Sequence, residues 1–151
     1  IKKEEKTMEK KVIIITGASR GIGREIAKTL AQEGHTVIAN YNKSEEQAKQ
    51  LKKELEEKGK EIEIYKADVS KEEECKKIVE YTIKKYKKID VLINNAGIDK
   101  LQLIIDVTKK DWDNIINTNL YGAFCMSQQA AKNMIQNKIN GPYGKRILLM
   151  G

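Results

Sequence analysis

Five short apolar runs recur along this 151-residue sequence, and at least one segment of helical period separates each run from the next. Short runs rich in β-branched side chains are typical of strands that are buried on both faces. When strands alternate with helices, each helix carries the chain back along the sheet, so neighbouring strands run parallel. The sequence therefore predicts an α/β fold, a doubly wound parallel sheet covered by helices on both faces. The expected strands lie at residues 11–16, 35–41, 61–67, 90–94 and 146–150.

Capping signals indicate where three of the helices begin. In a capping box, the N-cap side chain and the side chain three residues later bond to each other's backbone amides. The pairs with this spacing are Ser44 with Gln47, Ser70 with Glu73, and Thr108 with Asp111. A further helix is expected at 24–34, after a glycine-rich stretch, and a long one at about 119–136.

The composition is that of one globular domain with a charged surface. Hydrophobic residues make up 40% of the sequence and charged residues 34%, and no apolar run approaches the length of a membrane span. A net charge of +7 is compatible with an acidic partner or nucleic acid. However, the basic residues are mostly lysines interleaved with glutamates, as in KKELEEKGKE at 52–61, which indicates solvated helix faces. We therefore expect no nucleic-acid or membrane partner.

The first residues of the sequence indicate where the domain begins, and the cysteines indicate the cellular compartment. Residues 1–7 are polar and precede Met8, so we expect a non-native or disordered leader there and a single domain at 8–151. Cys75 and Cys125 lie in helical contexts without metal-ligand spacing. We expect reduced thiols, no bound metal and a cytoplasmic protein.

A glycine-rich turn, TGASRGIG at 16–23, joins the first expected strand to the first helix. Such a turn lets backbone N–H groups approach a pyrophosphate, and the helix N-terminus favours the negative charge. Glycine is needed at Gly17, Gly21 and Gly23 because a Cβ would block the approach or the required φ. Glycine spacing alone is a weak signal, but its place at the first strand–helix junction favours a dinucleotide site over a plain tight turn.

With three further motifs, the GxxxGxG spacing resembles the short-chain dehydrogenase/reductase family. The further motifs are DVS (68–70), NNAG (94–97) and WDNIINTNLYGAF (112–124), and they follow in the family's order. The stretches TGASRGIG, NYNKSEE and NNAGI are similar to those of its 3-oxoacyl-[acyl-carrier-protein] reductase branch. The resemblance implies a Rossmann sheet of order 3-2-1-4-5-6-7, of which this sequence supplies the order 3-2-1-4-5, truncated after strand five.

The end of the second strand bears on the choice of nicotinamide cofactor. An acidic residue there would bond the ribose 2′-hydroxyl and repel a 2′-phosphate, whereas Arg or Lys accepts the phosphate. The segment reads Asn40, Tyr41, Asn42 and Lys43, with no acid among them. Arg20, in the glycine-rich turn, has a guanidinium that can pair with the same phosphate. These residues predict NADP(H) rather than NAD(H).

The resemblance implies further cofactor contacts. Asp68 is expected to bond the adenine amino group and Val69 to contact the adenine through its backbone. The alternative for Asp68 is a carboxylate that stabilises a helix N-terminus. The other expected cofactor-binding residues belong to the glycine-rich turn and to NNAG: Thr16, Gly17, Ser19, Gly21, Ile22, Gly23, Asn94, Ala96 and Gly97.

Catalysis in this family uses a Ser, a Tyr with a Lys four residues later, and an Asn that anchors a water relay, which together provide acid catalysis and electrostatic stabilisation. The resemblance assigns the Asn to Asn119, before Leu120, and places the Ser and the Tyr-x-x-x-Lys pair after Gly151. Tyr81 and Lys85 have the same spacing but precede NNAG, so we interpret them as a surface pair.

Three functions remain open at this stage. The first is an NADP(H)-dependent reductase of 3-oxoacyl thioesters in fatty acid synthesis, a homo-oligomer in which this stretch binds the cofactor and is inactive alone. The second is a non-catalytic nucleotide-binding module that docks on a partner. The third is a family member with another carbonyl or alcohol substrate. We also expect the fifth strand to be an exposed edge and the long helix to expose an apolar patch of Ala123, Phe124, Ala130, Ala131, Met134 and Ile135.

Overall fold

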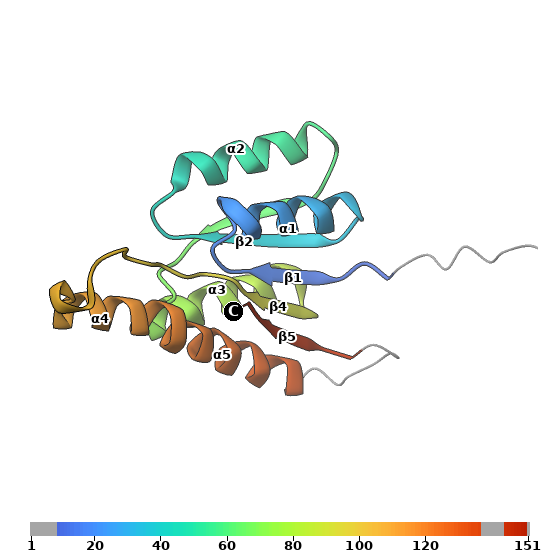
Figure 1. Cartoon of the computed structure of the whole chain (residues 1–151). Coiled ribbons are helices and arrows are strands. Elements are labelled where there is room, and N and C mark those ends of the chain that lie inside the picture. Colours follow the sequence, from blue (N-terminus) through green and yellow to red (C-terminus); the bar gives the residue numbers. More distant parts are fainter. Residues whose placement is uncertain (1–8, 137–143, 151) are drawn as a thin grey trace, which may run out of the picture.

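A parallel sheet between two layers of helices forms the core of the protein (Figure 1). The computed structural model describes residues 9–136 and 144–150, so the leader expected at 1–7 lies outside the described residues. The strands are β1 (Val12–Ile15), β2 (Thr36–Tyr41), β3 (Ile62–Lys66), β4 (Val91–Asn94) and β5 (Arg146–Leu149). The helices are α1 (Gly21–Gln32), α2 (Glu45–Glu56), α3 (Glu72–Tyr86), α4 (Lys109–Ile116) and α5 (Gly122–Gln136), with a 3-10 turn at Ile104–Asp106 and a π-helical turn at Asn117–Tyr121. The strand order β3-β2-β1-β4-β5 confirms the predicted doubly wound fold.

β1 is the central strand. Ile13 pairs with Val37 of β2 on one side and with Val91 of β4 on the other, both in parallel register. The side chains of β1 alternate between two buried clusters: Ile13 and Ile15 pack with α1 and α2, whereas Val12 and Ile14 pack with α3 and α5. A strand covered on both faces is continuously apolar, which explains why the first run was predicted correctly.

Of the three predicted capping boxes, only the one that begins α4 is present. Thr108 Oγ1 accepts a hydrogen bond from Asp111 N at 3.1 Å, and the Asp111 carboxylate accepts one from Thr108 N at 3.3 Å. The other two predictions were wrong. Ser44 is the N-cap residue of α2 but its side chain makes no capping bond. Ser70 precedes the N-cap residue of α3, and its hydroxyl donates instead to Asp68 Oδ1 at 2.6 Å.

β5 lies at an edge of the sheet and, among the described strands, pairs only with β4. Leu148 lies opposite Ile93 in this pairing. All four residues of β5 are exposed, and the exposed fraction of Leu149 reaches 69%. The prediction of an exposed edge strand is therefore confirmed.

The long helix predicted at 119–136 is one part of a longer helical run. α4, the π-helical turn and α5 follow one another without a break. The apolar patch on α5 is smaller than predicted, because Ala130 and Met134 are buried in the cluster that α5 forms with α3. Phe124 and Ile135 are exposed as predicted.

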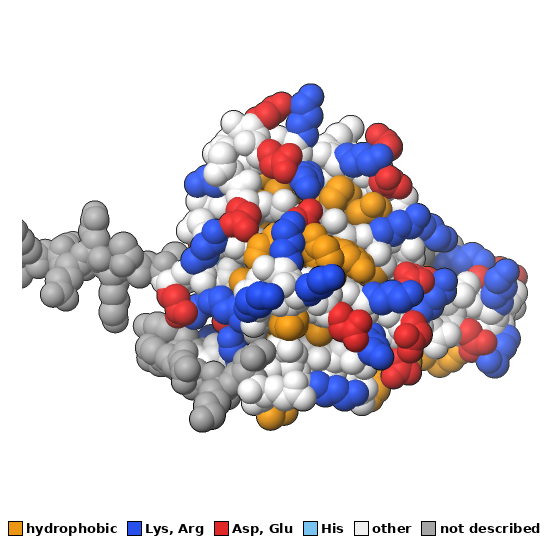
Figure 2. All heavy atoms as spheres, turned by 180° about the vertical axis from the view of Figure 1, so that it is seen from behind, with side chains coloured by type: hydrophobic (Ala, Val, Ile, Leu, Met, Phe, Trp, Pro, Cys, Tyr) orange, Lys and Arg blue, Asp and Glu red, His pale blue; other side chains and the backbone are white. Residues whose placement is uncertain are grey.

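Cationic and acidic side chains are interspersed on the face shown in Figure 2. On α2, for example, Lys49 pairs with Glu45 at 2.9 Å and Lys52 with Glu56 at 3.7 Å. The mixed charges agree with the predicted solvated helix faces. Within residues 9–136 and 144–150, the helices are too short or too polar to cross a bilayer. The same residues contain no cluster of three or more side chains suited to holding a metal ion.

Both cysteines are free and buried, Cys75 on α3 and Cys125 on α5. Cys75 Sγ donates to Val69 O at 3.2 Å. Burial, followed by the neighbouring Cys125 thiol, raises the pKa of Cys75 well above its ordinary value. A buried thiol that stays protonated is a poor nucleophile, so Cys75 serves packing.

Asp90 joins three strands at the edge of the sheet where the strands begin. Its Oδ1 accepts from Lys145 Nζ at 2.6 Å, while Oδ2 accepts from Val12 N at 2.8 Å and Lys88 Nζ at 3.0 Å. Its backbone carbonyl accepts from Arg146 N at 3.0 Å. Burial alone would raise the pKa of Asp90, but the bonds from Lys145, Val12 N and Lys88 outweigh it and hold that pKa below its ordinary value.

We predict that Asp90→Asn lowers the free energy of unfolding near neutral pH by about 1–3 kcal/mol, because two lysines lose a buried anionic partner. Since the pKa of Asp90 is lowered by folding, its contribution is present above the unfolded-state pKa of about 3.9 and is lost as the pH falls through the folded-state pKa. Urea denaturation of both proteins should therefore show a difference that shrinks in acid.

Asp99→Asn is the matched control. Asp99 is exposed, and its carboxylate has no ion pair with any residue that the structure describes. This control should change the free energy of unfolding little at either pH. Equal effects of the two substitutions would contradict the role assigned to Asp90.

Candidate functional site

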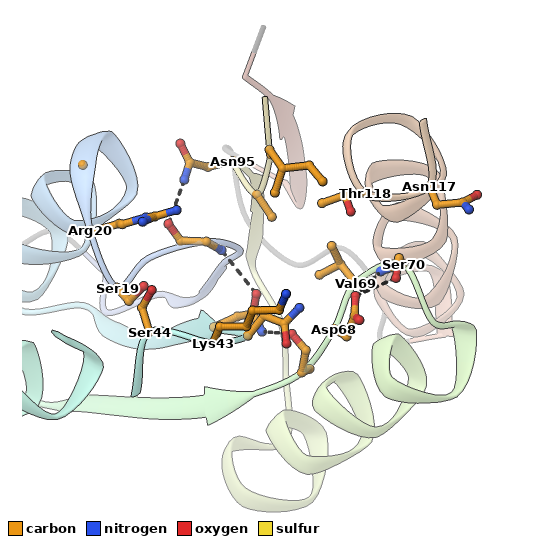
Figure 3. A pocket seen from close by; sticks show the side chains of 18 of the residues that line it. Ser19, Arg20, Lys43, Ser44, Asp68, Val69, Ser70, Asn95, Asn117 and Thr118 are labelled. Atoms are coloured by element: carbon orange, nitrogen blue, oxygen red, sulfur yellow. Dashed lines mark hydrogen bonds between the residues drawn. The ribbon is translucent and has the colours of Figure 1, made fainter. Parts of the chain in front are cut away.

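A cavity of about 520 Å³ opens at the carboxyl ends of the four strands β1 to β4. In a doubly wound sheet this is where ligands bind, at the point where the connections on either side of the central strand leave toward opposite faces. The walls are the turn after β1, the ends of β2 and β3, the segment after β4, and the C-terminal end of α4 with the π-helical turn (Figure 3).

The turn between β1 and α1 depends on glycine for its conformation and for close contact. Gly17 has a φ of +64° and Gly21 a φ of +56°, in the left-handed region that favours glycine. An added Cβ on Gly17 would lie 2.8 Å from Ala96 Cα, and one on Gly23 would lie 2.5 Å from Gly17 O. The N-cap side chain of α1 makes no capping bond, so the first amides of that helix are available to an anion, as a phosphate site requires.

The segment after β4 holds this turn in place. Thr16 Oγ1 accepts hydrogen bonds from Asn95 N and Ala96 N, each at 3.0 Å. Asn95 Nδ2 donates to Thr16 O at 3.1 Å and to Gly17 O at 3.0 Å. Thr16 is only 1% exposed, so it supports the turn from beneath.

Two cationic side chains of the lining, Arg20 and Lys43, have no hydrogen bond or ion pair with other described residues. Figure 3 shows them with the glycine-rich turn and the end of β2. Arg24, one turn further along α1, is occupied: its guanidinium donates to Gln47 O at 3.0 Å and to Glu54 Oε2 at 3.1 Å. Unpaired cations beside a polar cavity attract an anion, so this part of the cavity suits a phosphate group.

The end of β3 forms another wall. Asp68 Oδ1 accepts from Ser70 N at 3.0 Å and from Ser70 Oγ at 2.6 Å. Burial alone would raise the pKa of Asp68, but the bonds from Ser70, together with Lys71 and Asn42, hold that pKa below its ordinary value. The carboxylate is therefore ionised and orders the turn into α3, in line with the alternative considered for it. Its side chain is 24% exposed and still lines the cavity.

The π-helical turn places Asn119 against the segment after β4. Asn119 Oδ1 accepts from Ile98 N at 2.8 Å, and its Nδ2 donates to Ile98 O at 2.9 Å. π-helical turns within α-helices often mark functional sites. Because both polar atoms of the side chain bond to Ile98, Asn119 orients the residue that follows NNAG. It does not line the cavity, and its catalytic role stays a prediction.

A sequence model of the short chain dehydrogenases matches residues 11–143, most of the chain. This chain belongs to the short-chain dehydrogenase family. The glycine-rich turn, NNAG and the Asn119 segment all lie within the matched residues. The family also accounts for the sheet order and the position of the cavity.

Three relatives illustrate the similarity. The chain is 39% identical over 128 residues to the 3-oxoacyl-[acyl-carrier-protein] reductase FabG of Staphylococcus epidermidis, over 85% of this chain and 52% of that protein. A mutant short-chain dehydrogenase/reductase of Serratia marcescens superposes with a TM-score of 0.78 at 31% identity, over 82% of this chain and 51% of that one. A short chain dehydrogenase of Burkholderia cenocepacia in complex with NADP gives 0.77 at 34%, over 81% and 50%. The chain thus spans about half the length of the relatives it matches.

The cavity brings together most of the cofactor-binding residues expected for a short-chain dehydrogenase. Those that line it are Gly17, Ser19, Arg20, Gly21, Asn40, Asn42, Lys43, Asp68, Val69, Ala96 and Gly97. The expected residues that do not line it are Thr16, Ile22, Gly23, Tyr41 and Asn94. The residues that sequence reasoning missed are Ser44, Ala67, Ser70, Asn95, Ile98, Asn114, Asn117 and Thr118.

The expected residues outside the lining are buried or face elsewhere. Tyr41 is 8% exposed, and Gly23 packs against Gly17. Ile22 is 67% exposed and lies in a groove along α1. Asn94 is buried, and its Nδ2 donates to Ser127 Oγ at 3.0 Å.

The missed residues fall into two groups. Most adjoin predicted residues at strand ends, so the strand boundaries and the NNAG motif were the available signal. Asn114, Asn117 and Thr118 come from α4 and the π-helical turn, and only the folded chain brings these residues to the cavity.

The Tyr-x-x-x-Lys pattern of Tyr81 and Lys85 does not contribute to the cavity. Tyr81 and Lys85 lie on α3, where Lys85 forms an ion pair with Glu63 and its Nζ donates to the Tyr81 hydroxyl at 3.4 Å. The interpretation of this pair as a surface feature agrees with that position.

We predict that Gly23→Ala distorts the glycine-rich turn. The new Cβ would lie 2.4 Å from Asn95 Nδ2 and 2.5 Å from Gly17 O, so backbone must move, at a cost of about 1–3 kcal/mol. Amide hydrogen exchange should become faster in residues 16–23.

Gly59→Ala is the control, because Gly59 has a φ of +68° but no neighbour within 4 Å of an added Cβ. Gly59→Ala should lower the free energy of unfolding, because alanine is strained at a positive φ, but exchange in residues 16–23 should not become faster. Faster exchange of residues 16–23 in both variants would argue against a local clash at Gly23.

Proposed function

We propose that the full-length protein is an NADP(H)-dependent reductase that transfers hydride to the carbonyl group of a 3-oxoacyl thioester, with this stretch binding the cofactor. The cofactor choice rests on the cationic side chains of Arg20 and Lys43 at the rim of the cavity. They have no ion pair with other described residues, and the adjacent end of β2 has no acidic residue. The resemblance extends the proposal to a cytoplasmic enzyme of fatty acid synthesis that assembles as a homo-oligomer.

Each wall of the cavity would recognise a different part of the cofactor, which supplies the hydride when bound. The amides at the N-terminus of α1, where the glycine-rich turn enters the helix, would bind the pyrophosphate. The guanidinium of Arg20 and the ammonium of Lys43 would bind the 2′-phosphate, the guanidinium through paired hydrogen bonds. Asp68 and Val69 would face the adenine. The Burkholderia relative in complex with NADP supports this choice.

The substrate class rests on relatives. The Staphylococcus protein that this chain resembles is a 3-oxoacyl-[acyl-carrier-protein] reductase. In the proposed enzyme, Asn119 would act by holding Ile98 and the backbone after NNAG beside the cofactor. The substrate would be a carbonyl compound, either free or attached to an acyl carrier protein.

We predict that Arg20→Gln weakens NADPH binding by roughly 10- to 100-fold, because a charge-assisted contact to the 2′-phosphate is worth about 1.5–3 kcal/mol. NADH, which lacks that phosphate, should bind with nearly unchanged Kd. Titration calorimetry of both cofactors with the wild type and the variant measures this selectivity. Lys77→Gln is the control, since Lys77 is an exposed lysine on α3 outside the lining. A wild-type protein that binds NADH more tightly than NADPH would overturn the cofactor assignment.

The full-length protein tests the reaction. With NADPH, we expect a higher kcat/KM for a 3-oxoacyl thioester than for a ketose or a steroid ketone at equal concentration. A preference for one of the other carbonyl compounds would contradict the substrate assignment. Tight NADPH binding without turnover of any of them would favour a nucleotide-binding module instead.

A further inference from the structure

Asn40 has a buried side chain whose amide nitrogen and carbonyl oxygen are both hydrogen-bonded. It lies near the carboxyl end of β2 and is 2% exposed. Its Oδ1 accepts from Gly17 N at 3.2 Å. Its Nδ2 lies 2.9 Å from Ala67 O and 3.3 Å from both Tyr41 O and Tyr65 O. Three carbonyl oxygens around one nitrogen fix the orientation of the amide.

The partners of Asn40 belong to two different walls of the cavity. Gly17 opens the glycine-rich turn, and Ala18 N in the same turn donates to the backbone carbonyl of Asn40 at 2.8 Å. Ala67 follows β3 and directly precedes Asp68. One residue of β2 therefore connects the wall expected to bind phosphate with the wall expected to bind adenine.

We infer that Asn40 is a positioning residue that sets the spacing of these two walls, rather than a residue that reads the cofactor. The inference rests on the proposed function, since that function names what the walls bind. With the Gly17 amide and the Ala67 carbonyl held before the ligand arrives, less conformational freedom is lost on binding. The sequence had grouped Asn40 with the residues that contact the cofactor, whereas its side-chain bonds all go to backbone.

Only an amide of this length meets both requirements. A carboxylate, as in Asn40→Asp, has the same shape and can accept from Gly17 N, but it would present an oxygen to three carbonyl oxygens without a proton to donate. Alanine, as in Asn40→Ala, removes both sets of bonds. The two variants thus separate the link to the turn from the link to β3.

Binding of two cofactors distinguishes positioning from recognition. NADPH and NADH share the adenosine and the pyrophosphate, so displacement of the walls should weaken both by a similar factor, roughly 10- to 100-fold for each Asn40 variant. Arg20→Gln, in contrast, should affect NADPH alone. The measurement uses the full-length protein, well below the Tm of every variant.

Thr82→Val is the matched control for the loss of a buried polar group. Thr82 is 0% exposed, and its Oγ1 donates to Ile78 O at 2.8 Å on α3, outside the lining. This variant should bind both cofactors like the wild type. Asn40 variants that fold and bind both cofactors normally would overturn the inference, and so would a loss confined to NADPH. A wild type that binds neither cofactor would instead contradict the proposed function.

Amide hydrogen exchange of the unmodified, cofactor-free protein tests the positioning role without any variant. If Asn40 holds the turn, the Gly17 amide should exchange as slowly as amides of the paired strand β1. Rapid exchange of Gly17 in the free protein, slowed only when NADPH is added, would show that the ligand and not Asn40 orders the turn. This measurement decides the positioning role even if the Asn40 variants do not fold.

Discussion

The burial of β1 between β2 and β4 is the constraint on which the rest of the structure depends. Because β1 is paired along both edges and covered on both faces, its own groups are all occupied up to Thr16, whose amide bonds Ile93 O at 3.0 Å. Beyond Thr16, Asn40 accepts from the amides of Gly17 and Ala18, so the amides without an intrahelical partner are those that begin α1. After β1 the chain runs to the face of the sheet that α1 covers, whereas after β4, the neighbouring strand, it runs to the face that α5 covers. The cavity therefore opens at the common end of these two strands.

The shape of the cavity is held from below by neutral polar side chains. Thr16 and Asn95 bond each other's segments, and Asn40 bonds the turn and the end of β3. An unsatisfied buried polar group would cost about 1–3 kcal/mol, so each of these bonds strongly favours one arrangement of the walls. The charged groups Arg20 and Lys43 remain at the rim, where they can meet a ligand.

The elements that sequence reasoning predicted well are those with a local signature. β-branched runs identified the strands, and glycines identified the turn, because burial and left-handed φ act within a few residues. The capping boxes predicted at Ser44 and Ser70 were wrong, because a side-chain hydroxyl can bond any of several nearby groups and the sequence alone does not place those groups. The direction of the Asn40 side chain depends on the carbonyls of Tyr65 in β3 and of Ala67 directly after it, more than twenty residues away. The contribution of Thr118 depends on a π-helical turn that hydrophobic periodicity does not reveal.

That π-helical turn also sets the rotation of α5 relative to α4. A π-helical turn accommodates one residue more than the α-helix around it, and each residue of an α-helix advances the side chains by about 100°. Without the extra residue, Asn114 of α4 could not line the cavity while Met126 and Ala130 of α5 pack against α3. The number of residues between Asn114 and Met126 is therefore constrained by the cavity and the core together, so a one-residue deletion there would be more disruptive than most single substitutions. Sequence alignments of relatives should accordingly be free of gaps across this segment.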